Sequence, residues 1–308
     1  MSERKCPMIR ILESPALPLR AAVHSGVFHA DDVLCAALLY LSYGRENVQI
    51  VRTRDPEILD SCTVVLDVGG RDEITEQRVC LDHHQPGSLI RENGIKAAAC
   101  GKLADLMFAD EPRLLYMMRD LFLNDVEAQD NGQHASGRHL FSFVHSMNPT
   151  WQEPPEKEDE YFLEAAKMAE TILSHLISRL RARLVAEERI RLAIEETYDR
   201  GVVTLDRCYD WVRQVVAYNA EHPDRKVLFV IFPASGEYDL QAVPAGPDTF
   251  ESEKSLPAAW AGKRNGELAA ATGIAGSVFC HITGFLAVFH TLEEARAASE
   301  LALASKDE

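Results

Sequence analysis

Three ionisable residues in a row, Asp82-His83-His84, follow the apolar run Val79-Cys80-Leu81 and precede a turn at Gln85-Pro86-Gly87. Burying aspartate or histidine is costly unless a metal ion or an opposite charge meets the side chain. The triplet therefore has two interpretations, metal-binding groups at the end of a buried strand or exposed turn histidines behind a capping aspartate. The triplet alone does not decide between them.

Three further groups of histidine or aspartate lie where we expect strands to end. They are His24 with His29 and Asp31, then Asp67, then Asp130. In an open parallel sheet, the carboxyl ends of the strands face one crevice, where ligands bind. Each group alone has a structural explanation, such as a core histidine, a helix cap or a turn. Caps and turns do not require alignment at one sheet edge, so the four groups together favour a binding site.

The chemistry of these side chains points to divalent transition metals. Mixed imidazole and carboxylate ligands suit Mn²⁺, Co²⁺, Fe²⁺ or Zn²⁺, whereas Ca²⁺ prefers oxygen ligands alone. The candidate ligands are His24, His29, Asp31, Asp67, His83 and Asp130. Six ligands exceed the need of one tetrahedral ion, so two ions that share a bridging carboxylate fit better. Two ions about 3.5–4 Å apart can hold a hydroxide and clamp the attacking and leaving oxygens of a phosphoryl group.

The elements that must position these groups alternate between strands and helices. In the first half we predict strands over 19–23, 47–53, 63–68 and 79–81, and helices over 33–39, 96–109 and 113–127. Because the strands are continuous in apolar residues, they predict a parallel sheet covered on both faces. The first domain is expected to span residues 1–150.

The second half predicts a helical connector over 151–200 and a smaller α/β domain over 201–308. Residues 161–198 carry an apolar stripe at helical spacing, and could form one broken helix or two. That stripe could equally pack internally or against a second copy of the chain, which leaves a homodimer open. Beyond it we predict strands over 202–205, 227–232, 238–243, 277–281 and 286–289, and a helix over 292–304.

Composition limits the class of partner. The formal net charge of −16 over 308 residues works against binding long nucleic acid, which usually needs a basic surface. No stretch is long and apolar enough to span a bilayer, and the start, Met1 to Lys5, precedes no apolar signal core. We therefore expect a cytoplasmic protein with no membrane partner. The seven cysteines lack CxxC spacing and are expected to be reduced thiols.

Several stretches together resemble the DHH phosphoesterase superfamily, and more closely the Myg family (melanocyte-proliferating-gene proteins) of DHH-like 3′–5′ exonucleases. The similarity covers nearly the whole chain. The matching stretches are His24-Ser-Gly-Val-Phe-His29-Ala-Asp31-Asp32, Val51-Arg-Thr-Arg-Asp-Pro56, Val65-Leu-Asp67-Val-Gly-Gly70, Asp82-His-His-Gln85, Val126-Glu-Ala-Gln-Asp130-Asn-Gly132, Gln241-Ala-Val-Pro244, Phe250-Glu-Ser252, Leu256-Pro257, Trp260, Gly273-Ile-Ala-Gly276 through His281, and Gly284-Phe285.

The resemblance implies a DHH-type parallel-sheet domain, a two-ion site and a role for each candidate residue. His24 and His29 would bind one ion, while Asp31, His83 and Asp130 would bind the other, and Asp67 would bridge them. In the wider superfamily an aspartate is usual at the position of His29, and the spacing from His24 is one residue shorter. The implied cofactor is Mn²⁺, two ions per site, with Mg²⁺, Co²⁺ or Zn²⁺ as alternatives.

Two residues of the triplet receive other roles from the resemblance. Asp82 would orient a metal-binding histidine, which fixes the tautomer of the ring. His84 would face the substrate phosphate.

Substrate-binding candidates lie mostly in the second half of the chain. They are Lys254, Arg264, His281 and Gly284, with Trp260 beside them and Arg54 in the first half. A glycine loop lets backbone N–H groups approach a phosphate, and arginine offers a planar fork. Trp260 in a proline-rich segment could instead be core packing, and Lys254 could be solvated. Arg52 and Arg54 could pair with Asp55 or reach a phosphate, and the sequence does not choose.

The expected function is a divalent-metal-dependent phosphodiesterase, a 3′–5′ exonuclease on RNA or short oligonucleotides. One alternative is a phosphohydrolase that uses the same site on a dinucleotide or pyrophosphate. Another is a non-enzymatic, metal-bound RNA-binding module. The enzyme alternatives both require Asp67 for function, whereas the binding module does not.

Overall fold

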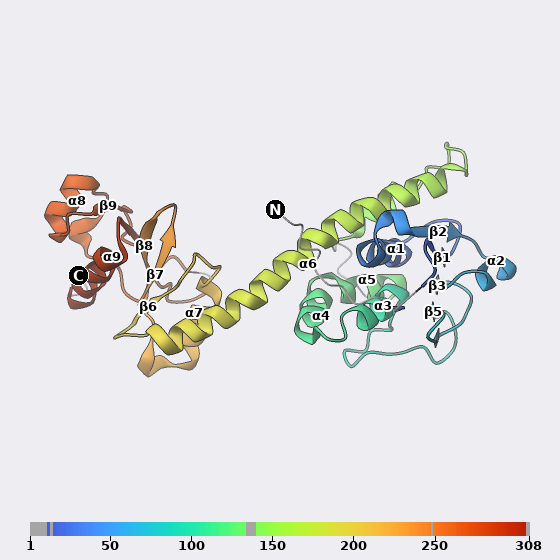
Figure 1. Cartoon of the computed structure of the whole chain (residues 1–308), viewed down its shortest axis with the longest axis horizontal. Coiled ribbons are helices and arrows are strands. Elements are labelled where there is room, and N and C mark those ends of the chain that lie inside the picture. Colours follow the sequence, from blue (N-terminus) through green and yellow to red (C-terminus); the bar gives the residue numbers. More distant parts are fainter. Residues whose placement is uncertain (1–10, 13–14, 134–139, 248, 306–308) are drawn as a thin grey trace. The chain divides into compact units, whose positions relative to one another are not determined.

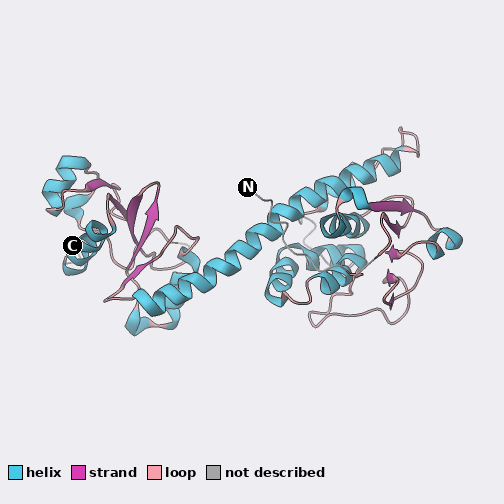
Figure 2. Cartoon of the chain, viewed as in Figure 1, coloured by secondary structure: helices cyan, strands magenta, loops and turns pink. Residues whose placement is uncertain are grey.

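The structure is a computed structural model, and it describes residues 11–12, 15–133, 140–247 and 249–305. The chain forms two compact units, Met1–Arg181 and Ala182–Glu308. Each unit contains a five-stranded sheet with helices around it, as labelled in Figure 1 and coloured by element type in Figure 2. The expected α/β fold class, a mainly parallel sheet followed by a smaller α/β unit, is confirmed.

The sheet of the first unit has the strand order β2-β1-β3-β5-β4. Its strands are β1 (Leu19–Val23), β2 (Val48–Arg52), β3 (Val64–Leu66), β4 (Glu73–Ile74) and β5 (Val79–Leu81). Strands β2, β1, β3 and β5 run parallel to one another, and β4 pairs antiparallel with β5 at the edge of the sheet. Strands β3 and β5 are buried at every position, as expected for continuous apolar runs in a parallel sheet.

Helices pack mainly on one side of this sheet. The helical elements of the first unit are α1 (Ala30–Tyr43), η1 (Arg45–Asn47), α2 (Pro56–Asp60), α3 (Ala99–Met107), α4 (Pro112–Met118), η2 (Arg119–Leu123), α5 (Asn124–Asp130), η3 (Ser142–Met147) and the start of α6 (Lys157–Thr197). Figure 1 shows α1, α3 and α5 on one side of the sheet and the short α2 on the other. The helix predicted over 113–127 is therefore three segments, because η2 is a π-helical insertion between α4 and α5.

A buried ionic cluster fixes η2 and α5 against α3. Arg91 donates to both carboxylate oxygens of Glu127 and, at 3.0 Å, to Asp105. Arg119 of η2 pairs with the same two acids. A Cβ atom on Gly101 of α3 would lie 1.7 Å from the Glu127 carboxylate, so only glycine fits there. The fully buried Glu127 thus joins three segments of the chain.

The sheet of the second unit has the order β6-β7-β8-β10-β9. Its strands are β6 (Val202–Thr204), β7 (Phe229–Ala234), β8 (Glu237–Ala242), β9 (Ser277–Cys280) and β10 (Leu286–Phe289). Only β6 and β7 pair in parallel. Its helical elements are α7 (Val212–Glu221), η4 (Pro223–Arg225), η5 (Ala258–Trp260), α8 (Asn265–Thr272) and α9 (Leu292–Ala304).

Two of these helices were not predicted from the sequence. Helix α7 contains three valines, whose β-branched side chains lower helix propensity. Helix α8 has only eight residues and begins with Asn265-Gly266, a pair typical of turns. Packing against the sheet, through residues such as Val215 and Leu268, outweighs these local preferences.

Helix α6 is one continuous helix of 41 residues rather than a broken one. Phe162 and Leu173 on its apolar stripe are buried in the first unit. Ile190 and Ile194 lie in a core cluster of the second unit. The stripe therefore packs internally along these turns, within each unit.

The described part of the chain contains neither a disulfide nor a membrane-crossing helix. Its six cysteines are all free thiols, and five of them are buried. None of its helices combines the length and the apolar character needed to cross a bilayer.

Candidate metal centre

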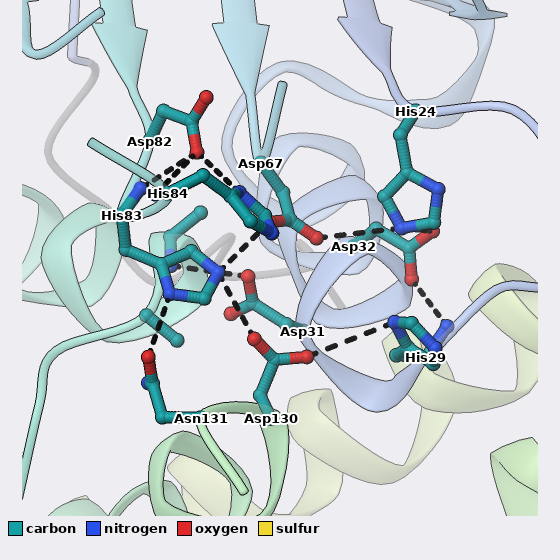
Figure 3. Close-up of polar contacts among 12 residues, drawn as sticks. His24, His29, Asp31, Asp32, Asp67, Asp82, His83, His84, Asp130 and Asn131 are labelled. Carbon is teal, nitrogen blue, oxygen red and sulfur yellow. Dashed lines mark hydrogen bonds and ion pairs between the residues drawn. The ribbon is translucent and has the colours of Figure 1, made fainter. Parts of the chain in front are cut away.

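Three adjacent strands of the first sheet end in the candidate ligands. His24 follows β1, Asp67 follows β3, and the Asp82-His83-His84 triplet follows β5. Since β1, β3 and β5 are neighbours in the sheet, these side chains meet at its carboxyl edge, as Figure 3 shows. The alignment that the sequence predicted for these three groups is present in the fold.

Asp67 occupies the middle of the site. Its backbone has φ = 58°, a left-handed conformation that costs a non-glycine residue about 1–3 kcal/mol. The Asp67 amide donates to the Leu81 carbonyl at 2.9 Å, which helps to hold this conformation. The carboxylate is 2% exposed, with Oδ1 3.0 Å from Nε2 of His83 and Oδ2 3.5 Å from Nε2 of His24. One carboxylate thus faces histidines from both neighbouring strands.

The first turn of α1 supplies two fully buried carboxylates. Asp31 accepts hydrogen bonds from the amides of Ala99 (3.0 Å) and Cys100 (2.7 Å) at the start of α3. Asp32 uses Oδ1 to accept from the amides of His29 and Val33, both at 2.9 Å. Its Oδ2 makes no hydrogen bond to the described residues, and this buried oxygen requires a cation or a donor.

Asp32 was not among the predicted ligands. Its orphaned Oδ2 lies 3.3 Å from Nε2 of His24. In the sequence, Asp31 and Asp32 could both be helix caps, and nothing distinguished their second oxygens. Only the three-dimensional position of His24 reveals that Asp32 faces the site.

Asp130 reaches the site from a helix, which corrects the prediction that it follows a strand. It is the last residue of α5, and its Oδ2 lies 3.0 Å from Nε2 of His83. Its Oδ1 lies 3.8 Å from Nδ1 of His29. The apolar pattern before Asp130 is helical, and α5 directly follows the η2 insertion (Arg119–Leu123).

His83 is oriented by Asn131, a residue that the sequence analysis missed. The Asn131 amide nitrogen donates to the carbonyls of Lys96 and Glu127, both at 2.9 Å, so Oδ1 is the atom that faces His83. That oxygen lies 3.0 Å from Nδ1 of His83 and can only accept. The proton of the neutral ring is therefore held on Nδ1, and Nε2 keeps the lone pair that a metal needs.

Asp82 and His84 form a pair of their own. The Asp82 carboxylate accepts from the amides of Gly70, His83 and His84 and from Nδ1 of His84 at 2.7 Å. Burial opposes its charged form, but the hydrogen bonds from the His84 ring and these amides lower the pKa of Asp82. The ring that Asp82 holds belongs to the 61%-exposed His84, and Asp82 contacts His83 through the backbone amide of His83.

His29 is the most exposed of the six candidate ligands. It is the N-cap of α1, and its side chain is 52% exposed. Its ring lies 5.5 Å from the ring of His24 between centroids. It therefore stands at the mouth of the site, where Figure 3 places it beside Asp32 and Asp130.

The geometry of the site fits divalent ions. Metal–ligand bonds of about 2.1 Å place neighbouring ligand atoms roughly 3.0–3.4 Å apart. Nε2 of His83 lies 3.0 Å from both Asp67 Oδ1 and Asp130 Oδ2, and Nε2 of His24 lies 3.5 Å from Asp67 Oδ2. Ligand atoms of Asp31, Asp67, His83 and Asp130 all lie within 4.8 Å of one another. These four residues can hold one ion, and ligand atoms of Asp67, Asp82, His83 and His84 form a second group within the same distance.

The charges of the site also require a cation. Among the described residues, no lysine or arginine side chain pairs with the five carboxylates of Asp31, Asp32, Asp67, Asp82 and Asp130. Burial raises the pKa of Asp31 and Asp32 well above its usual value, and the Asp67 charge raises it further. Burial opposes the charged form of His83, but hydrogen bonds to Asp130 and Asp67 raise its pKa to about 11. Five carboxylates thus outnumber the positive charge that His83 can supply, and the site attracts cations.

We expect Mn²⁺ to stabilise the chain more strongly as the pH rises. The raised pKa values of Asp31 and Asp32 mean that their contribution to metal-free stability falls as the pH rises above their unfolded pKa. The contribution of His83 to metal-free stability is fully present below pH 6.5 and is lost as the pH rises toward 11. Metal binding requires these groups without protons, so its affinity rises over the same range.

Thermal melting at about pH 6 and about pH 8, in Mn²⁺ or in a chelator, measures this effect. When free Mn²⁺ exceeds its Kd 100-fold, the gain is about 2.7 kcal/mol. Ca²⁺, which prefers oxygen ligands alone, is the control and should stabilise the chain less. Equal melting temperatures with Mn²⁺ and chelator at both pH values would contradict the metal site.

The predicted substrate-binding residues have varied surroundings. In the second unit, Lys254 Nζ donates to the Ser305 carbonyl at 2.9 Å and so caps α9, and Trp260 is buried in the core. The exposed guanidinium of Arg264 lies 4.4 Å from the centre of the Phe279 ring. His281 Nδ1 contacts the Thr283 hydroxyl at 2.9 Å.

Gly284 and the two arginines near β2 complete these candidates. Gly284 has φ = 68° and is buried, so it serves the turn before β10. Arg54 is exposed and lines a separate cavity of about 230 Å³ with Gly69. Arg52, in contrast, is a structural residue: its guanidinium is 3% exposed, pairs with Asp159 at 2.9 Å and donates to the Gly26 carbonyl.

The chain matches one protein family along nearly its whole length. The MYG1_exonuc family model, described as "Uncharacterised protein family (UPF0160)", matches residues 20–303. A mouse (Mus musculus) protein named MYG1 exonuclease is 32% identical, over 99% of this chain and 90% of its own length. The human (Homo sapiens) MYG1 exonuclease is 32% identical, over 94% of this chain and 87% of its own length.

A bacterial relative and a solved structure are similar over comparable lengths. The MYG1 protein of Chlamydia trachomatis is 32% identical, over 93% of this chain and 97% of its own. A crystal structure of exonuclease RecJ bound to manganese covers 94% of this chain and 91% of its own, with 15% identity and a TM-score of 0.28, too low to carry an argument. On the family model and the curated relatives, the chain belongs to the MYG1 exonuclease family, as its motifs indicated.

Proposed function

We propose that the chain is a divalent-metal-dependent exonuclease that degrades RNA or short oligonucleotides from the 3′ end, with two ions at its metal centre. The observation that carries this proposal is the position of Asp67 between two groups of ligands. Asp31, His83 and Asp130 lie on one side of it, and His24 with His29 on the other. Membership in the MYG1 exonuclease family supports the hydrolysis of nucleic acid ends.

The protein's own residues prepare the site for phosphodiester hydrolysis. Divalent ions supply Lewis acidity toward the phosphate and make water a stronger nucleophile at neutral pH. Asn131 keeps Nε2 of His83 available, and the amides at the start of α3 hold Asp31 in place. Asp82 holds the ring of His84, which is exposed and can contact the substrate phosphate.

The net charge of −16 supports short or end-bound substrates over long duplexes. A phosphate near five carboxylates is repelled unless cations intervene, so the substrate depends on the ions for its binding.

Purified protein with Mn²⁺, incubated with end-labelled oligonucleotides, tests the proposal. A strand labelled at its 5′ end should shorten progressively from the 3′ end, and a chelator should stop the reaction. Release of the 5′ label as the first product would overturn the polarity. Hydrolysis of pyrophosphate or a dinucleotide alone would favour the small-molecule phosphohydrolase, and binding without hydrolysis would favour the RNA-binding module.

A further inference from the structure

A cavity of about 150 Å³ lies directly beside the metal centre. Its lining residues include Asp31, Val126, Asp130, Phe141, Ser142 and His145. Asp31 and Asp130 belong to the cluster of candidate ligands, so the cavity and the metal centre share a wall. The other four residues play no part in metal binding. A cavity of this size holds about one six-membered ring.

The far wall of the cavity, formed by η3, is anchored at both ends. At its start, Phe141 packs edge-on against Phe122 with the ring centres 5.1 Å apart. At its end, the Asn148 side chain accepts from the Phe28 amide at 2.9 Å and donates to the Phe28 carbonyl at 2.8 Å. Phe28 lies between His24 and His29, so η3 is fixed to the segment that carries these candidate ligands.

The chemistry of the lining favours a neutral ring over an anion. Among the residues that the structure describes, no lysine or arginine lines the cavity, while two carboxylates do, so these walls would repel a phosphate. Val126 and Phe141 supply apolar surface. Neither the Ser142 hydroxyl nor the His145 ring hydrogen-bonds to another described residue. Apolar walls with a few free polar groups are typical of small-molecule sites.

We propose that this cavity binds the base of the terminal nucleotide, which in a pyrimidine is a single six-membered ring, while the phosphate of that nucleotide lies at the metal centre. The inference rests on the proposed exonuclease function and specifies how the strand end is recognised. The phosphate and the nucleoside are joined by one ester bond, and Asp130 borders both places. The cavity accommodates one base, which selects a strand end over an internal position.

Binding of a product-like probe tests the cavity without requiring turnover. We expect uridine 5′-monophosphate to bind the Mn²⁺-loaded protein about tenfold more tightly than inorganic phosphate, measured by calorimetry, because its ring is buried. Ser142→Leu should fill the cavity and abolish this difference while phosphate binding persists. Ser142→Ala leaves the space open and should retain most of the difference in affinity between the two probes.

Ser146→Leu is the matched control, because Ser146 lies on the same η3 helix, is exposed and does not line the cavity. It should bind both probes as the unmodified protein does. Thermal melting in Mn²⁺ establishes that each variant is folded. Equal affinity for the two probes, or an unchanged preference in Ser142→Leu, overturns the base pocket. If the protein prefers the nucleotide to phosphate but does not degrade a strand, the exonuclease function is wrong and the pocket is still supported.

Discussion

Replacing Asp67 with asparagine is expected to lower the rate of oligonucleotide hydrolysis in Mn²⁺ by roughly a thousandfold or more, about 4 kcal/mol of transition-state stabilisation. The substitution keeps the shape of the side chain and removes the charge that faces both His24 and His83. Asparagine tolerates a left-handed backbone as aspartate does, so the conformation at φ = 58° is retained. The measurement is the initial rate on a labelled strand at saturating Mn²⁺.

Two controls make the Asp67→Asn result specific. Asp110→Asn removes an exposed carboxylate outside the site and should leave the rate unchanged. Thermal melting in chelator then shows that Asp67→Asn is folded, because the substitution removes both the repulsion between Asp67 and the buried Asp31 and Asp32 and the attraction between Asp67 and His83. A rate within about threefold of the original would exclude Asp67 as the shared ligand. Such a result would mean that the hydrolysis does not depend on the Asp67 carboxylate.

The second large effect is expected from Glu127→Ala, which should lower the free energy of unfolding of the first unit by about 3–5 kcal/mol. The change leaves the guanidinium groups of Arg91 and Arg119 without their buried partner. It also removes the acceptor for the Ala98 amide, 3.2 Å away. Urea denaturation, followed by a probe in the first unit, measures the loss.

Glu160→Ala provides the comparison, because Glu160 lies in the same unit, is 54% exposed and pairs with Lys157 on the helix surface. Exposed pairs contribute little, so its unfolding midpoint should not change. Glu127 lies three residues before Asp130 on α5, so Glu127→Ala should also weaken Mn²⁺ binding. Similar midpoints for the two variants would mean that the buried cluster does not fix α5.

The strand-end groups could be predicted because their signal is local. His24, Asp67 and His83 each follow a short apolar run, and such runs predict buried strands whatever lies elsewhere in the chain. The parallel order of those strands then brings their ends together. Predicting these features required only the residues adjacent in the sequence and the general geometry of open sheets.

The remaining parts of the site depend on contacts between distant residues. The end of α5 reaches the site because of the π-helical η2 and the ionic cluster centred on Glu127, neither of which has a local apolar signature. Asn131 follows Asp130 and precedes a glycine, so its sequence context indicates only a turn. Its role depends on the carbonyl of Lys96, 35 residues away in the chain.

The residues of the second unit illustrate the same limit. Lys254 and Trp260 are charged or aromatic residues of a type that often binds substrates. In the fold, Lys254 caps α9 and Trp260 fills the core. Arg264 lies at the surface with its guanidinium over the ring of Phe279. The ring of His281 lies beside the rings of Phe279 and Phe285. Residue type alone could not separate these two pairs.

A crystal structure of the protein grown with Mn²⁺, with the ions located by anomalous scattering, tests the central claim most directly. We predict two ions about 3.5–4 Å apart on either side of the Asp67 carboxylate. Asp31, His83 and Asp130 should bind one ion, and His24 and His29 the other. Ions that avoid Asp67, or a single ion at saturating Mn²⁺, would contradict the two-ion centre.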